Sequence, residues 1–125
     1  MTVATQEIAG DVGIFELEML SAELRSSEAY AQNGQAARTI VRTADLRQVL
    51  VVLAAGKTTS EHHASVTASL QVLTGQLRVE LPERGLEVQR AGLIVFAAGT
   101  QHSVRAQVDS AFLLTLGWPV HVGAQ

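Results

Sequence analysis

The fold of this chain is decided by two stretches of sequence, Gly56–Gly75 (GKTTSEHHASVTASLQVLTG) and Ala91–Ala106 (AGLIVFAAGTQHSVRA). Each combines a run rich in β-branched residues with glycines, which allow the positive φ of a tight connection. Histidines lie close to the ends of these runs, at His62 and His63 in the first and His102 in the second. Strands that pair side by side would bring His62 and His102 to one place, although they are far apart in the sequence.

Runs of the same kind recur along most of the chain. Short strands at this spacing, separated by turn residues, are typical of an all-β sandwich or barrel. The predicted strands are Thr39–Val41, Val49–Leu53, Val66–Leu73, Gln76–Leu81, Leu86–Gln89, Leu93–Ala97, Ser103–Ala106 and Ala111–Leu116.

The segment before these strands has a helical pattern. Ile14, Leu17, Leu20 and Leu24 recur near a 3.6-residue period, which predicts a helix or two short helical turns between Ile14 and Tyr30. The pair Asn33-Gly34 is a typical end for it. With 125 residues the chain is one domain, for which we expect an N-terminal helical segment over 1–35, a β-barrel over 36–118 and a tail over 119–125.

Between about Ala36 and Trp118 the chain resembles the cupin superfamily, specifically its small single-domain members. The first cupin motif is Gly, five residues, His, any residue, His, three or four residues, Glu, six residues and Gly. Gly56, His62 and Gly75 fit this spacing. The places of the second histidine and the glutamate hold Ala64 and Ala68.

The second cupin motif is matched in its centre. Gly99 and His102 fit, whereas Ala97 and Ala106 stand where proline and asparagine are usual. The spacing from Gly92 is one residue short, so the preceding residue, Ala91, is an alternative turn position. The resemblance implies an all-β fold, an antiparallel cupin-like (jelly-roll) β-barrel with a short N-terminal helical segment. It also implies a homodimer paired through edge strands.

Metal binding is the property that the altered motifs affect most. Of the four ligand positions that the family uses, only His62 and His102 carry ligand side chains in register, and His63 could join them only if the chain bulges there. Transition metals and zinc usually take three or more protein ligands. We therefore expect no tightly bound metal. The alternative is a divalent transition metal (Fe, Mn, Ni or Zn) on these histidines, completed by a water, a glutamine or a group from the tail.

Strand periodicity predicts an apolar wall beside the histidines. If His62 points into the barrel, alternate residues from Ala64 to Val72 share its face. Without a metal, His62 and His102 would bond to each other, to a backbone carbonyl or to water at the barrel mouth. Gln101 either orients a ligand or is a surface turn residue. The predicted ligand-binding residues are His62, His102, Ala68, Leu70, Val72 and Gln101, and no catalytic residue is identified.

The pattern favours a protein that binds a small, largely apolar molecule in its barrel. The alternative is a metal-dependent enzyme of the oxygenase, isomerase or lyase type that uses His62 and His102. A structural or protein-interaction module is a third, weaker hypothesis. Whether the protein is an enzyme is left open, because a fold alone does not determine function.

Composition excludes several other classes of function. A net charge of −3 with nine Lys and Arg residues provides no basic stripe for nucleic acid. There is no cysteine, which excludes disulfides and thiolate metal sites. No stretch approaches the roughly 20 apolar residues that span a bilayer, so we expect no membrane partner and a cytoplasmic location.

Overall fold

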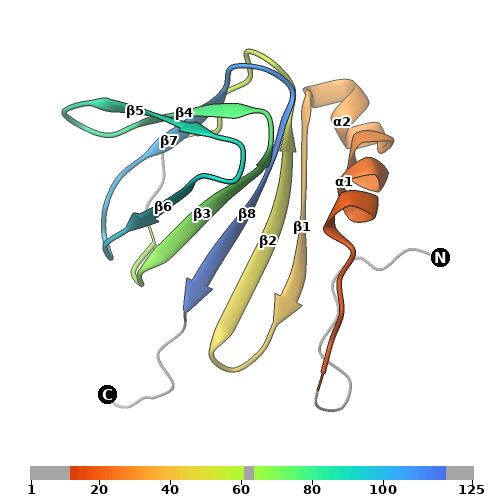
Figure 1. Ribbon diagram of the computed structural model, residues 1–125, viewed down its shortest axis with the longest axis horizontal. Helices are drawn as coiled ribbons and strands as arrows, with labels where there is room; N and C mark the ends of the chain where they lie inside the picture. The colour runs from red at the N-terminus through yellow and green to blue at the C-terminus, as the bar shows by residue number, and fades with distance from the viewer. Residues whose placement is uncertain (1–11, 61–63, 118–125) are drawn as a thin grey trace.

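The structure is a computed structural model that describes residues 12–60 and 64–117. Two short helices precede eight strands within these ranges, and each of these strands pairs antiparallel with its neighbours in its sheet (Figure 1). The elements are α1 (Leu17–Arg25), α2 (Glu28–Asn33), β1 (Gln35–Arg42), β2 (Leu46–Leu53), β3 (Ala68–Thr74), β4 (Gln76–Glu80), β5 (Gly85–Gln89), β6 (Leu93–Phe96), β7 (Ser103–Ala106) and β8 (Ser110–Gly117).

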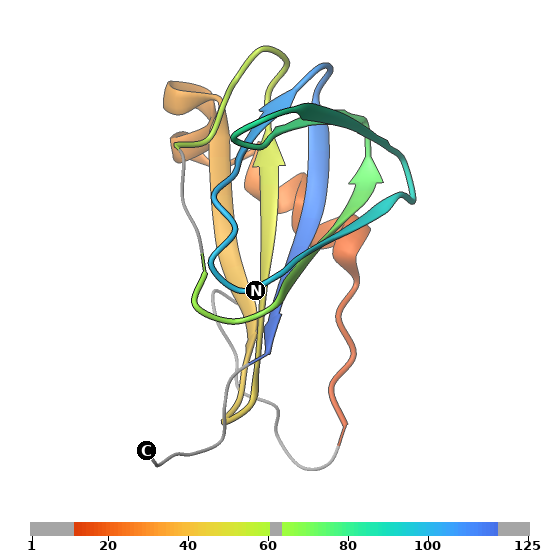
Figure 2. The same ribbon diagram turned by 90° about the vertical axis from the view of Figure 1, so that its left-hand side faces the viewer.

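The strands form two sheets that face each other. The larger sheet has the order β1-β2-β8-β3-β6, and the smaller has the order β5-β4-β7. The helices cover the outer face of the larger sheet, and the smaller sheet lies on the other side, in front of it in Figure 2. The expectation of an antiparallel jelly-roll barrel with a short helical segment is confirmed.

Strand β2 illustrates how one sequence supplies both faces of the larger sheet. Its even-numbered residues, such as Leu50 and Val52, pack with Leu24 of α1 in the outer core. Its odd-numbered residues, such as Val51 and Leu53, pack in the inner core between the two sheets. Because side chains alternate along a strand, the continuous run of apolar residues in β2 is buried on both sides.

The helical segment begins later than its periodicity predicted and consists of two helices. Glu16 is extended, with φ −88° and ψ 93°, and occupies the N-cap position of α1 without a side-chain hydrogen bond to the helix, while Ile14 before it is 82% exposed. Ser27 caps α2 by accepting a hydrogen bond from the backbone N–H of Tyr30. Gly34 ends α2 in the left-handed region, as the Asn33-Gly34 pair predicted. Within the described ranges, no helix is long and apolar enough to cross a membrane.

The predicted strands correspond to β1–β8, with differences at their ends. Strand β1 is longer than predicted because it pairs with β2 from Gln35 to Arg42, with one bulge after Thr39. Strand β3 begins at Ala68 rather than Val66, and residues 64–67 are irregular. The parity of Val66 with Ala68 predicted that both residues share the inward face of the strand. This prediction is wrong, because Val66 lies before the strand begins.

Ala91 has the left-handed backbone expected of the alternative turn position, with φ 68°. Its N–H donates to the carbonyl of Val72, which fixes this conformation where the chain turns toward β6. A left-handed conformation costs a non-glycine residue about 1–2 kcal/mol. We predict that Ala91→Gly raises the free energy of unfolding by about 1 kcal/mol. Glycine removes the cost of the left-handed conformation, but it also increases the conformational entropy of the unfolded chain, which offsets part of this gain in stability. Urea denaturation measures the change, and a lower stability than wild type would contradict it.

Candidate functional site

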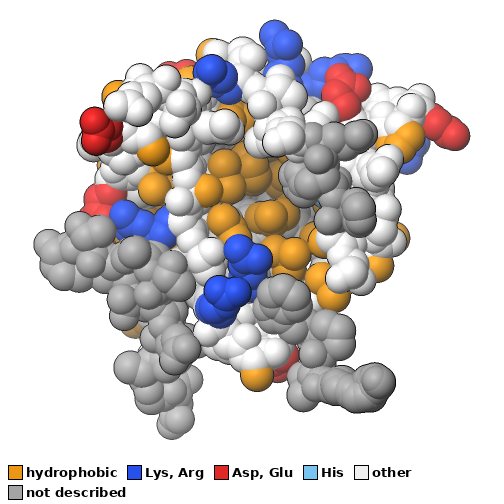
Figure 3. All heavy atoms as spheres, turned by 180° about the vertical axis from the view of Figure 1, so that it is seen from behind, with side chains coloured by type: hydrophobic (Ala, Val, Ile, Leu, Met, Phe, Trp, Pro, Cys, Tyr) orange, Lys and Arg blue, Asp and Glu red, His pale blue; other side chains and the backbone are white. Residues whose placement is uncertain are grey.

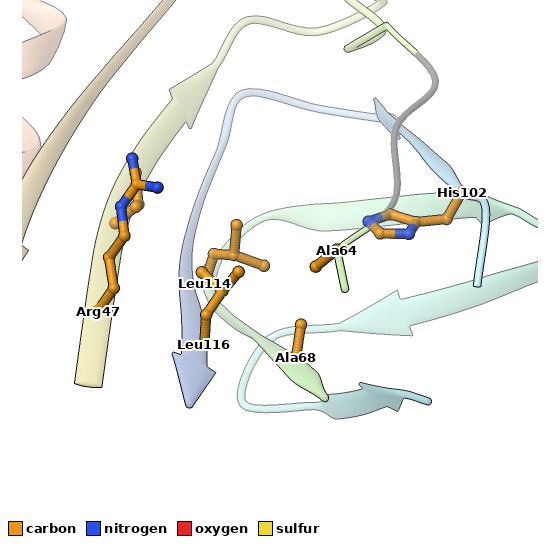
Figure 4. A pocket seen from close by; sticks show the side chains of 7 residues that line it. Arg47, Ala64, Ala68, His102, Leu114 and Leu116 are labelled. Atoms are coloured by element: carbon orange, nitrogen blue, oxygen red, sulfur yellow. The ribbon is translucent and has the colours of Figure 1, made fainter. Parts of the chain in front are cut away.

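The inner faces of the strands line a cavity of about 280 Å³ that is open on one side and lies next to His102. Strands β2, β3 and β8 form most of its wall, and the chain just before β3 and just before β7 completes it. Its lining residues are Arg47, Val49, Ala64, Ala68, His102, Leu114 and Leu116 (Figure 4). We call it the main cavity.

A second cavity of about 190 Å³ lies beside the main cavity and shares His102 and Leu114 with it. It extends between the sheets toward β1 and β7, and its lining is also mostly apolar. The other lining residues are Gln35, Ala37, Val51, Thr59, Leu70, Val104 and Phe112. Figure 3 shows a hollow in the surface with a hydrophobic floor and basic side chains at its edge, the same combination of residue types as in the main cavity.

His102 is fixed in place at the junction of the two cavities. It is 2% exposed, and its ring stacks on Phe96 of β6 with the centroids 4.0 Å apart and the planes 6° from parallel. Its Nδ1 lies 3.1 Å from the carbonyl oxygen of Thr100. A carbonyl only accepts, so Nδ1 carries the proton, and in the neutral ring Nε2 is an acceptor. The backbone carbonyl that the sequence suggested as a histidine partner is thus present.

The two alanines of the altered first motif lie at the main cavity. Ala64 and Ala68 both line it, and their side chains point into the space between His102 and β8 (Figure 4). Methyl groups at these places supply volume and no ligand atoms. In the described part of the chain, no three His, Cys, Asp or Glu side chains gather closely enough to hold a metal ion. Among the described residues, His102 is the one imidazole that lines the cavity.

The other predicted site residues lie in different environments. Leu70 lines the second cavity, and Val72 is fully buried in the inner core without lining either cavity. Gln101 is exposed and lines neither cavity. His62 and His63 lie outside the described residues, so their predicted approach to His102 stays a prediction.

Sequence reasoning missed Arg47, the one charged residue among the described residues that line the main cavity. The predicted strand began at Val49, whereas β2 begins at Leu46. Counting back by two from Val51 and Val49 places Arg47 on the inward face. That parity was the signal that could have found it.

A third cavity, of about 290 Å³, lies outside the barrel between α1 and the strands beneath it. It is more polar, since Glu18, Ser21, Arg25, Thr74 and Arg90 line it together with Leu17 and Leu73. The guanidinium of Arg25 already donates to the hydroxyl of Thr74, at 3.3 Å. We call it the outer groove.

Comparison with known proteins shows the fold. No model of a protein family matches the chain, and no curated protein matches it. A conserved protein of unknown function from Streptococcus pyogenes has a similar structure, with a TM-score of 0.66 and 24% identity over 72% of this chain and 79% of that one. A cupin superfamily protein from Desulfitobacterium hafniense also has a TM-score of 0.66, with 13% identity over 70% of this chain and 80% of that one.

A larger protein contains the same architecture. Salicylate 1,2-dioxygenase from Pseudoaminobacter salicylatoxidans, in a structure of its adducts with gentisate, matches with a TM-score of 0.73 and 16% identity. The match covers 82% of this chain and 32% of the dioxygenase. At these identities the likeness concerns the fold. It confirms the cupin fold that the two motifs predicted.

Proposed function

We propose that this chain, which has the cupin fold, binds a small and largely apolar molecule between its two sheets, without a tightly held metal. The observation that carries the proposal is the main cavity, an apolar space of about 280 Å³ with a buried, fixed histidine in its wall. Ligand sites are usually mostly apolar, with a few well-placed polar groups.

The size of the cavities limits the size of the molecule. Sites for drug-sized ligands measure about 300–1,000 Å³. The main cavity is just below that range, so it suits a single ring or a short chain, and the second cavity offers room for a substituent. The gentisate-containing dioxygenase supports this reading, because it joins a similar fold to a small aromatic molecule.

A metal-dependent enzyme remains the alternative function. The described residues of the site favour the binding of a small molecule over metal-dependent catalysis. An enzyme of that kind would need further ligands beside His102, and Ala64 and Ala68 provide none.

We also retain a homodimer and a cytoplasmic location as proposals. Strand β1 supports the former, since it is an edge strand of the larger sheet whose outer edge would be covered by pairing.

A thermal-shift screen with a blocked cavity tests the proposed function. Ala68→Phe places a ring in the main cavity, and Ser69→Phe, the control, places the same ring on the opposite face of β3. We predict that small aromatic and short-chain compounds raise the unfolding midpoint of the wild type and of Ser69→Phe, because a ligand of the folded state stabilises it. The same compounds should leave the midpoint of Ala68→Phe unchanged.

Two results would contradict the proposal. Ligands that stabilise Ala68→Phe as much as the wild type would lie elsewhere, and hits restricted to hydrophilic sugars would not suit an apolar wall. Far-ultraviolet circular dichroism first confirms that both variants are folded. Elemental analysis of the dialysed wild type distinguishes metal-free binding from the metal-dependent enzyme. We expect far less than one equivalent of Fe, Mn, Ni or Zn per chain. A stoichiometric metal that is lost in His102→Ala would favour the enzyme.

A further inference from the structure

Arg47 places a partly buried charge at the main cavity. It lies on the inward face of β2, directly opposite Leu116 of β8, and lines the main cavity with Leu114 and Val49. A charged group surrounded by apolar side chains is costly unless it is paired and hydrogen-bonded. The Nε atom of Arg47 is buried, and no residue in the described part of the chain accepts its hydrogen bond.

Two other arginines in the described ranges have such partners. Arg38 pairs with Glu23 of α1 at 3.2 Å, and Arg78 contacts Glu80 at 2.6 Å and Glu87 at 3.0 Å. These three ion pairs include neither Arg47 nor Arg42.

The neighbour of Arg47 on β1 increases its need for a negative charge. Arg42 is the register partner of Arg47, so both side chains lie on the same face of the sheet. Like charges in directly opposite positions destabilise a sheet. Asp45, in the turn between these strands, accepts a hydrogen bond from the hydroxyl of Thr43 and pairs with neither arginine in the described structure. An anion at the cavity would give Arg47 a partner and would reduce the repulsion between Arg47 and Arg42.

The guanidinium of Arg47 and the ring of His102 lie on opposite sides of the main cavity, with Leu114, Leu116 and Ala68 between them (Figure 4). A molecule in this space would therefore meet a cation at one end and apolar side chains along its body. Among the described residues, no carboxylate that would repel an anion lines the main cavity. The outer groove differs in this respect, because Glu18 lines it.

We propose that Arg47 binds the carboxylate of the ligand and thereby selects small monocarboxylates with an apolar ring or short chain. The planar fork of arginine presents two parallel N–H groups to the two oxygens of a carboxylate, and its two terminal nitrogens form one such pair. This proposal rests on the proposed function, since it concerns the same cavity. It names the class of ligand and the residue that determines it.

The test compares acids with neutral molecules of the same shape. Benzoate and hexanoate are titrated against benzamide and hexanamide, and dissociation constants are taken from amide shifts in ¹⁵N-labelled wild-type protein. We expect the wild type to bind each acid at least about 10-fold more tightly than its amide, as for one charge-assisted pair. Arg47→Met keeps the apolar stem of the side chain. In this variant the affinity for the acids should fall to the affinity for the amides, and the affinity for the amides should change little.

Two further variants make the result specific. Arg47→Lys keeps the charge without the fork and should recover only part of the preference for acids. Arg84→Met, in the exposed turn between β4 and β5 and outside the cavity linings, removes the same charge and should leave all four constants unchanged. The dispersion of the amide spectrum reports whether each variant is folded.

The outcomes separate this proposal from the proposed function. If acids and amides bind the wild type equally, or if Arg47→Met keeps the preference for acids, Arg47 is not the anchor and apolar binding still stands. If none of the four compounds binds the wild type, both proposals fail for ligands of this size. A preference for acids that Arg47→Met abolishes and Arg84→Met preserves supports both.

Discussion

Gly75→Ala is expected to lower the free energy of unfolding by about 2–5 kcal/mol. Gly75 links β3 of the larger sheet to β4 of the smaller one, and its φ is 88°, which alone costs alanine about 1–2 kcal/mol. A Cβ at this place would also lie 2.6 Å from the carbonyl oxygen of Asp109 and 2.8 Å from the Cα of Ser110. Backbone atoms cannot move aside easily, so overpacking adds to the loss of stability.

Gly56→Ala is the matched control for this substitution. Gly56 has nearly the same φ, 85°, yet an added Cβ would meet no atom within 4 Å. Urea denaturation should therefore show a loss of only about 1–2 kcal/mol for Gly56→Ala. If both variants lose the same amount, the connection at Gly75 does not pack against residues 109 and 110 as the structure describes.

Leu50→Ala is expected to cost about 2–5 kcal/mol, because Leu50 is fully buried in the outer core between α1 and the larger sheet. Truncation there removes apolar contacts and leaves a cavity beneath the helix. The same urea experiment measures the loss.

Leu93→Ala is the control, since Leu93 is in a strand of the same sheet but is 60% exposed. The free energy of unfolding of Leu93→Ala should differ from that of the wild type by no more than about 0.5 kcal/mol. A comparable loss in both variants would mean that the helical segment does not cover Leu50. The N-terminal helices would then be peripheral to the stability of the barrel.

The fold could be predicted because local signals agreed with one another. Short runs of apolar and β-branched residues located the eight strands of the described ranges, and Gly34 and Gly75 marked the ends of α2 and β3 where positive φ is required. The ends of β1 were missed, since the tertiary pairing with β2 extends that strand into Gln35-Ala36-Ala37-Arg38, where β propensity is low. Local propensity gives way to pairing at such places.

The candidate site was predicted less completely, because a cavity depends on which residues the sheets bring together. Parity along β3 led to Ala68 and Leu70, which line the two cavities. The same parity failed for Val66, since the chain is irregular before Ala68. The contributions of β8 and β2, above all Leu114 and Arg47, depend on the order of strands in the larger sheet. Periodicity in one segment does not contain that order.

The measurement that tests the account most directly is the set of nuclear Overhauser effects between methyl groups and the tightest ligand from the screen. We predict contacts to the methyls of Ala64, Ala68 and Leu114, which line the main cavity. Contacts restricted to Leu17 and Leu73, which line the outer groove, would contradict binding between the sheets.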